Sequence, residues 1–233
     1  MFERDQTYTD PMTAAATSTF LPKVYGWMTV GLALTALVAL FTLTSEQLLT
    51  LVFGNRLVFY GLIIAELGLV IALSAAINRI SATVATLMFL LYSALSGVTF
   101  ASIFLVYTSS SIASTFMVAS GTFGAMSLYG YATKRDLTGW GSFLFMGLIG
   151  IIIASVVNIF LHSEMITWVT SYLGVFVFVG LTAYDTQKIK MIGQNGFADE
   201  ESRRKAAILG ALTLYLDFIN LFLMLLRIMG NRR

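Results

Sequence analysis

The chain has 233 residues, of which 58% are hydrophobic and only 11% are charged. Soluble domains carry about 25% charged residues, so this composition predicts an all-α polytopic membrane protein. The net charge of +2 argues against a nucleic-acid partner, which requires a concentrated basic surface. The chain has no cysteine and one histidine, which excludes disulfides, thiolate metal sites and multi-histidine metal centres.

The first 22 residues are rich in Thr, Ala and Ser, and they include Pro11 and Pro22. No basic segment leads into a short apolar core, so this stretch does not have the pattern of a cleavable signal peptide. We expect residues 1–22 to form a largely disordered cytoplasmic tail. Residues 23–233 are then expected to form one transmembrane domain.

Seven apolar segments follow Lys23, and each is near the roughly 20 residues needed to cross about 30 Å of hydrocarbon. The expected spans are residues 24–44, 57–77, 81–107, 111–132, 140–161, 166–187 and 206–228. The only substantial loop expected between them is residues 188–205, which is polar and contains glycine.

Lysine and arginine are distributed unequally between the two sides that these spans define. With the N-terminus inside, the outer segments hold only Arg56, Arg232 and Arg233. The inner segments hold a larger set: Arg4, Lys23, Arg79, Lys134, Arg135, Lys188, Lys190, Arg203, Arg204 and Lys205. The positive-inside rule therefore predicts a cytoplasmic N-terminus and a C-terminus on the outer side, which suits an odd number of spans.

The last span, LTLYLDFINLFLMLLR (residues 212–227), is apolar but carries charge. A charge at membrane depth costs about 2.5–3.5 kcal/mol even on lenient insertion scales. Small and polar residues recur here at steps of three or four: Gly210, Thr213, Asp217, Asn220, Met224 and Arg227. This spacing places them on one helix face, which we expect to point into the protein or a wet cavity.

Few ionisable residues lie within the expected spans: Glu66, Asp185, Asp217 and Arg227, with Arg79 at the end of the second span. Such residues are candidates for function, and the alternatives are a buried structural pair or side chains that snorkel from a helix end. Two carboxylates that meet in a low-dielectric site cannot both ionise cheaply, so they titrate as a unit. Their deprotonation adds repulsion, which can open the site or offer it to a hard cation such as calcium.

The depths of Asp185 and Asp217 do not match on a simple count. At about 1.5 Å per residue, Asp185 lies close to the inner face and Asp217 lies nearer the midplane, about 10 Å away in depth. The two meet only if the last span starts well inside the cytosol or the sixth span tilts. Spacing alone therefore does not pair them.

Four stretches resemble the transmembrane Bax inhibitor motif (Bax inhibitor-1) family: GLTAYDTQKIK (180–190), ALTLYLDFINLFLMLLR (211–227), KRDLTGWGSFLFMGLIGI (134–151) and VVNIF (156–160). The resemblance covers essentially residues 23–233 and is closest to the bacterial inner-membrane branch. It implies a seven-helix bundle with a central last helix, acting as a pH-sensitive calcium leak channel. Its site residues would be a dyad of Asp185 and Asp217, which could bind calcium transiently, and a latch at Arg79. Glu66 and Arg227, with Asn220, would form a secondary gate or ion path.

Two other classes of function stay open. The first is a regulatory partner of membrane proteases or stress pathways, with residues 1–22 as the docking element. The second is an intramembrane aspartyl protease, which needs a flexible Gly-x-Gly-Asp at its second aspartate, whereas Asp217 follows Leu-Tyr-Leu. We therefore expect no enzyme and no cofactor, and calcium only as a permeant ion. The expected partners are the lipid bilayer, calcium and protons, and a seven-helix bundle could enclose its own pore as a monomer.

Overall fold

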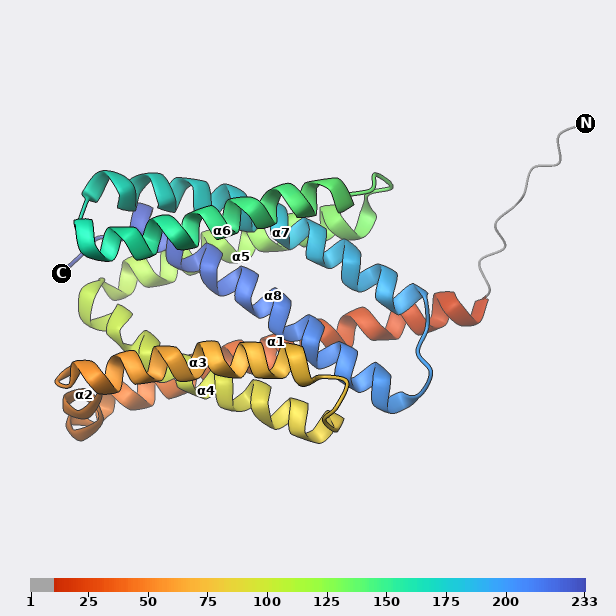
Figure 1. Ribbon diagram of the computed structural model, residues 1–233, viewed down its shortest axis with the longest axis horizontal. Coiled ribbons are helices and arrows are strands. Elements are labelled where there is room, and N and C mark those ends of the chain that lie inside the picture. The colour runs from red at the N-terminus through yellow and green to blue at the C-terminus, as the bar shows by residue number, and fades with distance from the viewer. Residues whose placement is uncertain (1–10) are drawn as a thin grey trace, which may run out of the picture.

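Residues 11–233 are described by a computed structural model, with side chains from Thr19 onward. They form eight helices (Figure 1): α1 (Pro11–Thr44), α2 (Glu46–Phe53), α3 (Arg56–Ala76), α4 (Ala82–Val106), α5 (Ser109–Ala132), α6 (Thr138–Leu161), α7 (Glu164–Gln194) and α8 (Glu200–Met229). Seven of these, all except the eight-residue α2, are long and apolar enough to cross a membrane. The predicted all-α architecture with seven spans is confirmed.

Side chains at the turns define where most helices begin. The residue before the helix accepts a hydrogen bond from a backbone N–H of the first turn at six positions: Ser45, Asn55, Ser81, Thr108, Ser163 and Asp199. These caps satisfy N–H groups that have no partner within the helix. His162 ends α6 in the left-handed conformation, with φ of 52°, and its N–H donates to the carbonyl of Asn158.

The structure corrects two expectations about the polar segments. Residues 11–22 belong to α1 and not to a disordered tail, and Phe20 is buried against Phe197, with ring centroids 4.8 Å apart. Residues 1–10 lie outside the described part. The expected loop 188–205 is mostly helical, because α7 continues to Gln194 and α8 starts at Glu200 behind its Asp199 cap. Polar sequence here forms helices that extend past the apolar spans.

The connections alternate between two ends of the bundle (Figure 1). One end, called here the α7–α8 end, holds the start of α1 and the turns α3–α4, α5–α6 and α7–α8. The other, called the C-terminal end, holds α2, the turns α4–α5 and α6–α7, and the C-terminus. The two termini of the bundle therefore lie at opposite ends, as an odd number of spans requires.

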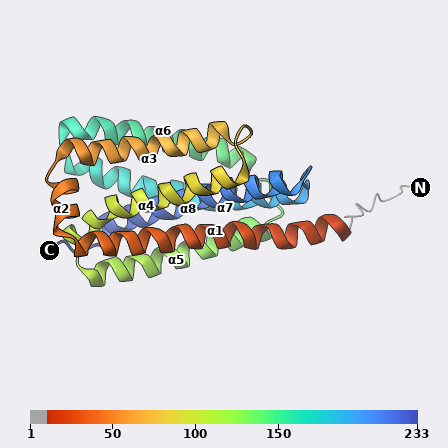
Figure 2. The same cartoon turned by 90° about the horizontal axis from the view of Figure 1, so that it is seen from below.

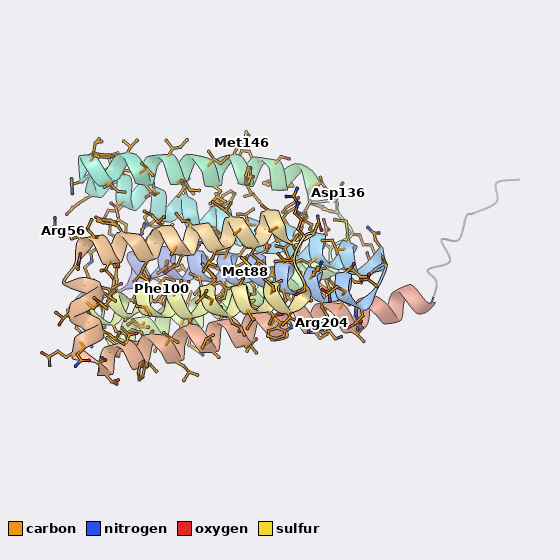
Figure 3. The ribbon with its side chains drawn as sticks, turned by 60° about the horizontal axis from the view of Figure 1, so that its bottom comes forward. Arg56, Met88, Phe100, Asp136, Met146 and Arg204 are labelled. Carbon is orange, nitrogen blue, oxygen red and sulfur yellow. The ribbon has the colours of Figure 1, made fainter. Side chains whose placement is uncertain are left out.

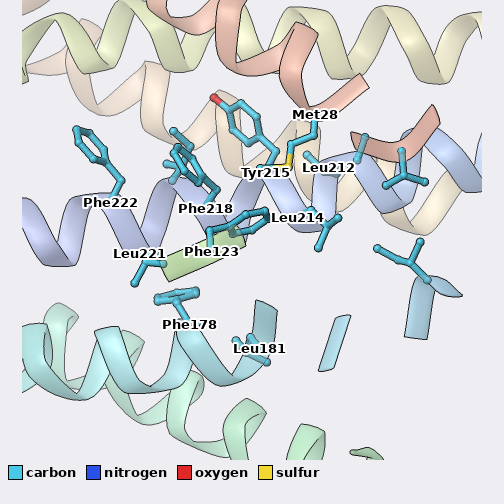
Figure 4. Packing of buried hydrophobic residues seen from close by; sticks show 14 of the residues in the cluster. Met28, Phe123, Phe178, Leu181, Leu212, Leu214, Tyr215, Phe218, Leu221 and Phe222 are labelled. Carbon is cyan, nitrogen blue, oxygen red and sulfur yellow. The ribbon is translucent and has the colours of Figure 1, made fainter. Parts of the chain in front are cut away.

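Helix α8 is the centre of the bundle, as predicted. It packs against α1, α4, α5 and α7, while α3 lies on α4 and α6 lies on α7 at the periphery (Figures 1 and 2). In the most apolar 18-residue window of each helix, 67% of the window is buried in α8 and only 6% in α3. Figure 4 shows aromatic side chains of α8, including Tyr215, Phe218 and Phe222, on one side of the helix and Phe178 and Leu181 of α7 on the other.

Candidate functional site

A cavity of about 820 Å³ lies beside α8, walled by residues of α3, α4, α6, α7 and α8. Its lining includes three carboxyl side chains: Glu66 from α3, Asp185 from α7 and Asp217 from α8. All three come from spans in which acidic residues are rare. Among the described residues, no group of three or more His, Cys, Asp or Glu side chains is arranged to hold a metal ion. The cavity therefore gathers acidic groups without forming a metal cage.

Asp185 and Asp217, called here the aspartate pair, are direct neighbours within this cavity. Their carboxyl groups lie within hydrogen-bonding reach of each other. Asp217 is 5% exposed, and its Oδ2 is buried without an N–H or O–H donor from the described residues. A carboxyl group can donate to another only when it carries a proton. The pair therefore holds a hydrogen bond only while at least one proton is bound.

The structure brings these two aspartates together despite the difference in depth counted from the sequence. Helix α8 starts at Glu200, six residues before the expected start of the span, which adds about 9 Å at the α7–α8 end. It also crosses the bundle obliquely in Figure 1. Starting the last span well outside the apolar region was one of the two conditions under which the aspartates could meet.

Glu66 of α3, in the same cavity, is held by hydroxyl groups of α4. Thr99 Oγ1 donates to Glu66 Oε1 at 2.5 Å, and Ser96 Oγ donates to Oε2 at 3.4 Å. Tyr92, which also lines the cavity, lies one helical turn before Ser96. Glu66 is therefore fixed in place by neutral donors, and no ion pair forms at Glu66 within the described residues.

Arg79 does not join the aspartate pair. Its side chain is exposed in the turn between α3 and α4, and it is not part of the cavity wall. The cation that does line the cavity is Lys188, one turn after Asp185 on α7, and its charge acts on Asp185. Sequence reasoning missed Lys188, although its spacing of three residues from Asp185 predicts a shared helix face.

Asn220 connects this cavity to a second one of about 550 Å³ between α6, α7 and α8. Its Nδ2 donates to the carbonyl of Leu216 at 2.8 Å, so its oxygen stays available to the cavities. Arg227 lines the second cavity and is exposed toward the C-terminal end. Three apolar residues, Leu148, Ile152 and Phe178, line both cavities with Asn220. The predicted face of α8 therefore lines the two cavities from Thr213 to Arg227.

Two carboxylates outside the spans behave differently from the cavity carboxyls. Hydrogen bonds from the hydroxyl and the backbone N–H of Thr138 lower the pKa of Asp136. The capping hydrogen bond from the Ser202 N–H lowers the pKa of Asp199. Both groups are solvent-exposed and stay ionised near neutral pH, which makes them suitable controls for substitutions in the cavity. Figure 3 shows Asp136 at the same end of the bundle as Arg204.

The chain matches a family model described as "Inhibitor of apoptosis-promoting Bax1" over residues 17–233. It is 60% identical to the inner membrane protein YbhL of Escherichia coli K12, covering 100% of this chain and 99% of that protein. It is also 50% identical to an uncharacterized protein of Borreliella burgdorferi, with 92% of each chain covered. An uncharacterized membrane protein of Streptococcus pyogenes is 38% identical, with 91% of this chain and 92% of that protein covered.

Proposed function

The chain belongs to the Bax inhibitor-1 family, and we propose that it lets calcium leak across the bacterial inner membrane under control of the aspartate pair. The observation that carries this proposal is the buried Oδ2 of Asp217, whose neighbouring polar group is the carboxyl of Asp185. A charge at this depth is costly, so two carboxyl groups placed there are candidates for function. Carboxylate oxygens are the ligands that calcium prefers.

The proposed gate has two states that differ in bound protons. With a shared proton, the aspartate pair is joined by a hydrogen bond between α7 and α8, and the cavity is closed around it. When that proton leaves, two negative charges face each other in a low-dielectric site and repel. A cation entering the cavity relieves this repulsion, so the flux of calcium is expected to rise with pH.

Lys188 takes part in this proposal as the cation at the cavity wall. It lies one helical turn after Asp185 on α7 and brings a positive charge to the cavity that holds the aspartate pair. Arg79, on an exposed turn, could reach the pair only after the α3–α4 turn moves, and we propose such a latch only for another state of the protein. Glu66, Asn220 and Arg227 lie along the two connected cavities and would line the path of the ion.

The test is the calcium flux into dye-loaded liposomes containing the purified protein, measured between about pH 6 and pH 8. One titrating proton changes its occupancy by up to about tenfold per pH unit, and we expect the wild-type flux to approach that steepness. Asp217→Asn and Asp185→Asn remove the shared proton site and should reduce the dependence to less than about twofold per unit.

Asp199→Asn is the matched control, because asparagine caps a helix as well as aspartate does. This variant removes a carboxylate that stays ionised outside the spans, and its pH profile should equal that of the wild type. A pH dependence that survives in both cavity variants contradicts the gate. Wild-type liposomes with no calcium flux above empty liposomes contradict the channel itself.

The first turns of α1 project beyond the bundle at the α7–α8 end (Figure 1), which favours a second candidate function. A projecting helix on a membrane protein suits docking to another protein, such as a membrane protease. Deleting residues 1–18 should then abolish co-purification of the partner while the calcium flux stays unchanged. Loss of both properties together would point to misfolding, and loss of neither would exclude docking through this helix.

A further inference from the structure

A third hollow lies on the side of α8 away from the aspartate pair. It is a groove of about 840 Å³ between α1 and α5. Phe218, Ile219 and Phe222 of α8 contribute to its wall, together with Phe100, Ile103 and Phe104 of α4. Its lining contains hydroxyl groups but no charged side chain. The groove is therefore apolar and separate from the proposed ion path.

The groove is accessible from the lipid phase. Ala33 and Ala36 of α1 and Ala113 of α5 line it and are exposed, and all three belong to membrane spans. Its lining extends along α1 from Tyr25 to Ala39, about 21 Å of helix. One leaflet contributes about half of the 30 Å of hydrocarbon, so the groove can hold one lipid chain along the full depth of a leaflet. Hydrocarbon is the medium available to fill it, since water is excluded there.

Polar and basic groups gather where the groove reaches the C-terminal end. Ser109 lines the groove at the start of α5, next to the hydroxyls of Thr108 and Ser110. The last residues of the chain dock onto this α4–α5 turn. The Thr108 N–H donates to the Asn231 carbonyl at 3.1 Å, and the Arg233 N–H donates to the Val106 carbonyl at 2.9 Å.

This docking places two arginines at the α4–α5 turn, which carries Ser109 of the groove. Arg232 forms an isolated β-bridge with Tyr107, which lies two residues before Ser109 in the chain. The side chains of Arg232 and Arg233 are exposed. Neither forms an ion pair within the described residues. Arginine binds phosphate with parallel N–H donors, and the hydroxyl of Ser109 at the same turn offers a further donor.

We propose that this groove is a binding site for an anionic phospholipid of the leaflet at the C-terminal end. One acyl chain lies between α1 and α5 against the aromatic side chains of α8. The headgroup phosphate lies at the α4–α5 turn, where Arg232 and Arg233 bind it. The site does not depend on the proposed calcium flux, and it uses none of the carboxyl groups of the cavity.

Native mass spectrometry of the full chain in detergent, titrated with phosphatidylglycerol or phosphatidylcholine, tests both halves of the site. The wild type should bind one phosphatidylglycerol in preference to phosphatidylcholine. If each arginine contributes about fivefold, R232Q with R233Q should weaken binding of phosphatidylglycerol by about 25-fold and remove the preference. Arg56→Gln is the control, because Arg56 is an exposed arginine at the same end of the bundle (Figure 3).

Filling the groove tests the position of the acyl chain. Ala36→Phe with Ala113→Phe places two rings in the groove from exposed positions and should abolish retention of both lipids. Ala65→Phe, on the exposed face of α3, is the control for added bulk. Circular dichroism and size-exclusion profiles equal to the wild type establish that each variant is folded. The proposal is overturned if the groove-filled variant retains lipid as Ala65→Phe does, or if the arginine variant matches Arg56→Gln.

Discussion

Tyr215 of α8 contacts both α1 and α4 at the centre of the bundle. It is fully buried, and its hydroxyl lies 2.7 Å from Thr35 Oγ1 of α1. The single proton of Thr35 is directed at carbonyls of Ser93 and Gly31, so Tyr215 is the donor to Thr35. Its ring also meets Tyr92 of α4 edge to face, with centroids 5.6 Å apart.

Tyr215→Phe keeps the ring and removes only the donor. Because the Thr35 oxygen is then left without its donor in a dry interior, we expect a loss of about 1–2 kcal/mol in free energy of unfolding. Unfolding of the detergent-solubilised protein, followed by circular dichroism, measures this loss. Tyr129→Phe removes an exposed hydroxyl and should change stability little. Equal stability of the two variants would mean that the buried hydrogen bond contributes nothing.

The residues of the cavity were partly predictable from the sequence. Asp217, Asp185 and Glu66 were found because charge is costly in a membrane, and that rule holds without knowledge of packing. The same rule does not predict which charged residues lie next to one another in the folded protein. Lys188 lines the cavity and Arg79 does not, because the first lies on a helix facing the cavity and the second lies on a turn whose direction depends on tertiary contacts.

At the scale of helices, the seven spans follow from length and hydropathy, whereas their ends do not. From hydropathy alone, the charged segment before residue 206 is predicted to be a loop. It is helical because Asp199 caps it and Glu200 pairs with Arg203 at 2.7 Å along the same turn. A hydrogen bond then connects the start of α8 to the α3–α4 turn, since Glu201 Oε1 accepts from the Ala82 N–H at 2.5 Å. That contact between segments 119 residues apart has no signal in the sequence.

Helix contacts depend on particular glycines that the sequence alone does not single out among nineteen. Gly97 of α4 faces α1, where a Cβ atom would lie 2.6 Å from the carbonyl oxygen of Thr35. Gly121 and Gly124 of α5 have open space at the same position. Close backbone approach therefore holds α4 against α1, while other glycines in the spans carry no such constraint.

The whole molecule is organised by α8, which separates two different hollows. The acidic cavity lies toward α3, α6 and α7, and the apolar groove lies toward α1 and α5. Phe100 and Ile219 belong to both walls. One helix can therefore border an ion path on its polar face and a lipid on its aromatic face, which is the amphipathic pattern predicted for it within the membrane.

The orientation of the protein in the membrane can be predicted from the basic residues at the two ends of the bundle, because the connections between helices alternate between those ends. The α7–α8 end carries the larger set of basic residues, including Arg79, Lys134 and Arg204, whereas the C-terminal end carries Arg56, Arg227, Arg232 and Arg233 (Figure 3). The positive-inside rule then places the α7–α8 end, and with it the cavity mouth near Lys188, in the cytoplasm. The proposed lipid site would face the outer leaflet.

Because the native chain has no cysteine, single-cysteine labelling tests this orientation without background. Gln47→Cys on α2 and Ala198→Cys in the α7–α8 turn are both exposed, at opposite ends of the bundle. A membrane-impermeant maleimide applied to spheroplasts should label Gln47→Cys at once. Ala198→Cys should react only after the membrane is permeabilised, since its turn lies on the basic side. The reverse order would place the acidic cavity's mouth outside, where a rise in external pH rather than cytoplasmic pH would have to open the proposed gate.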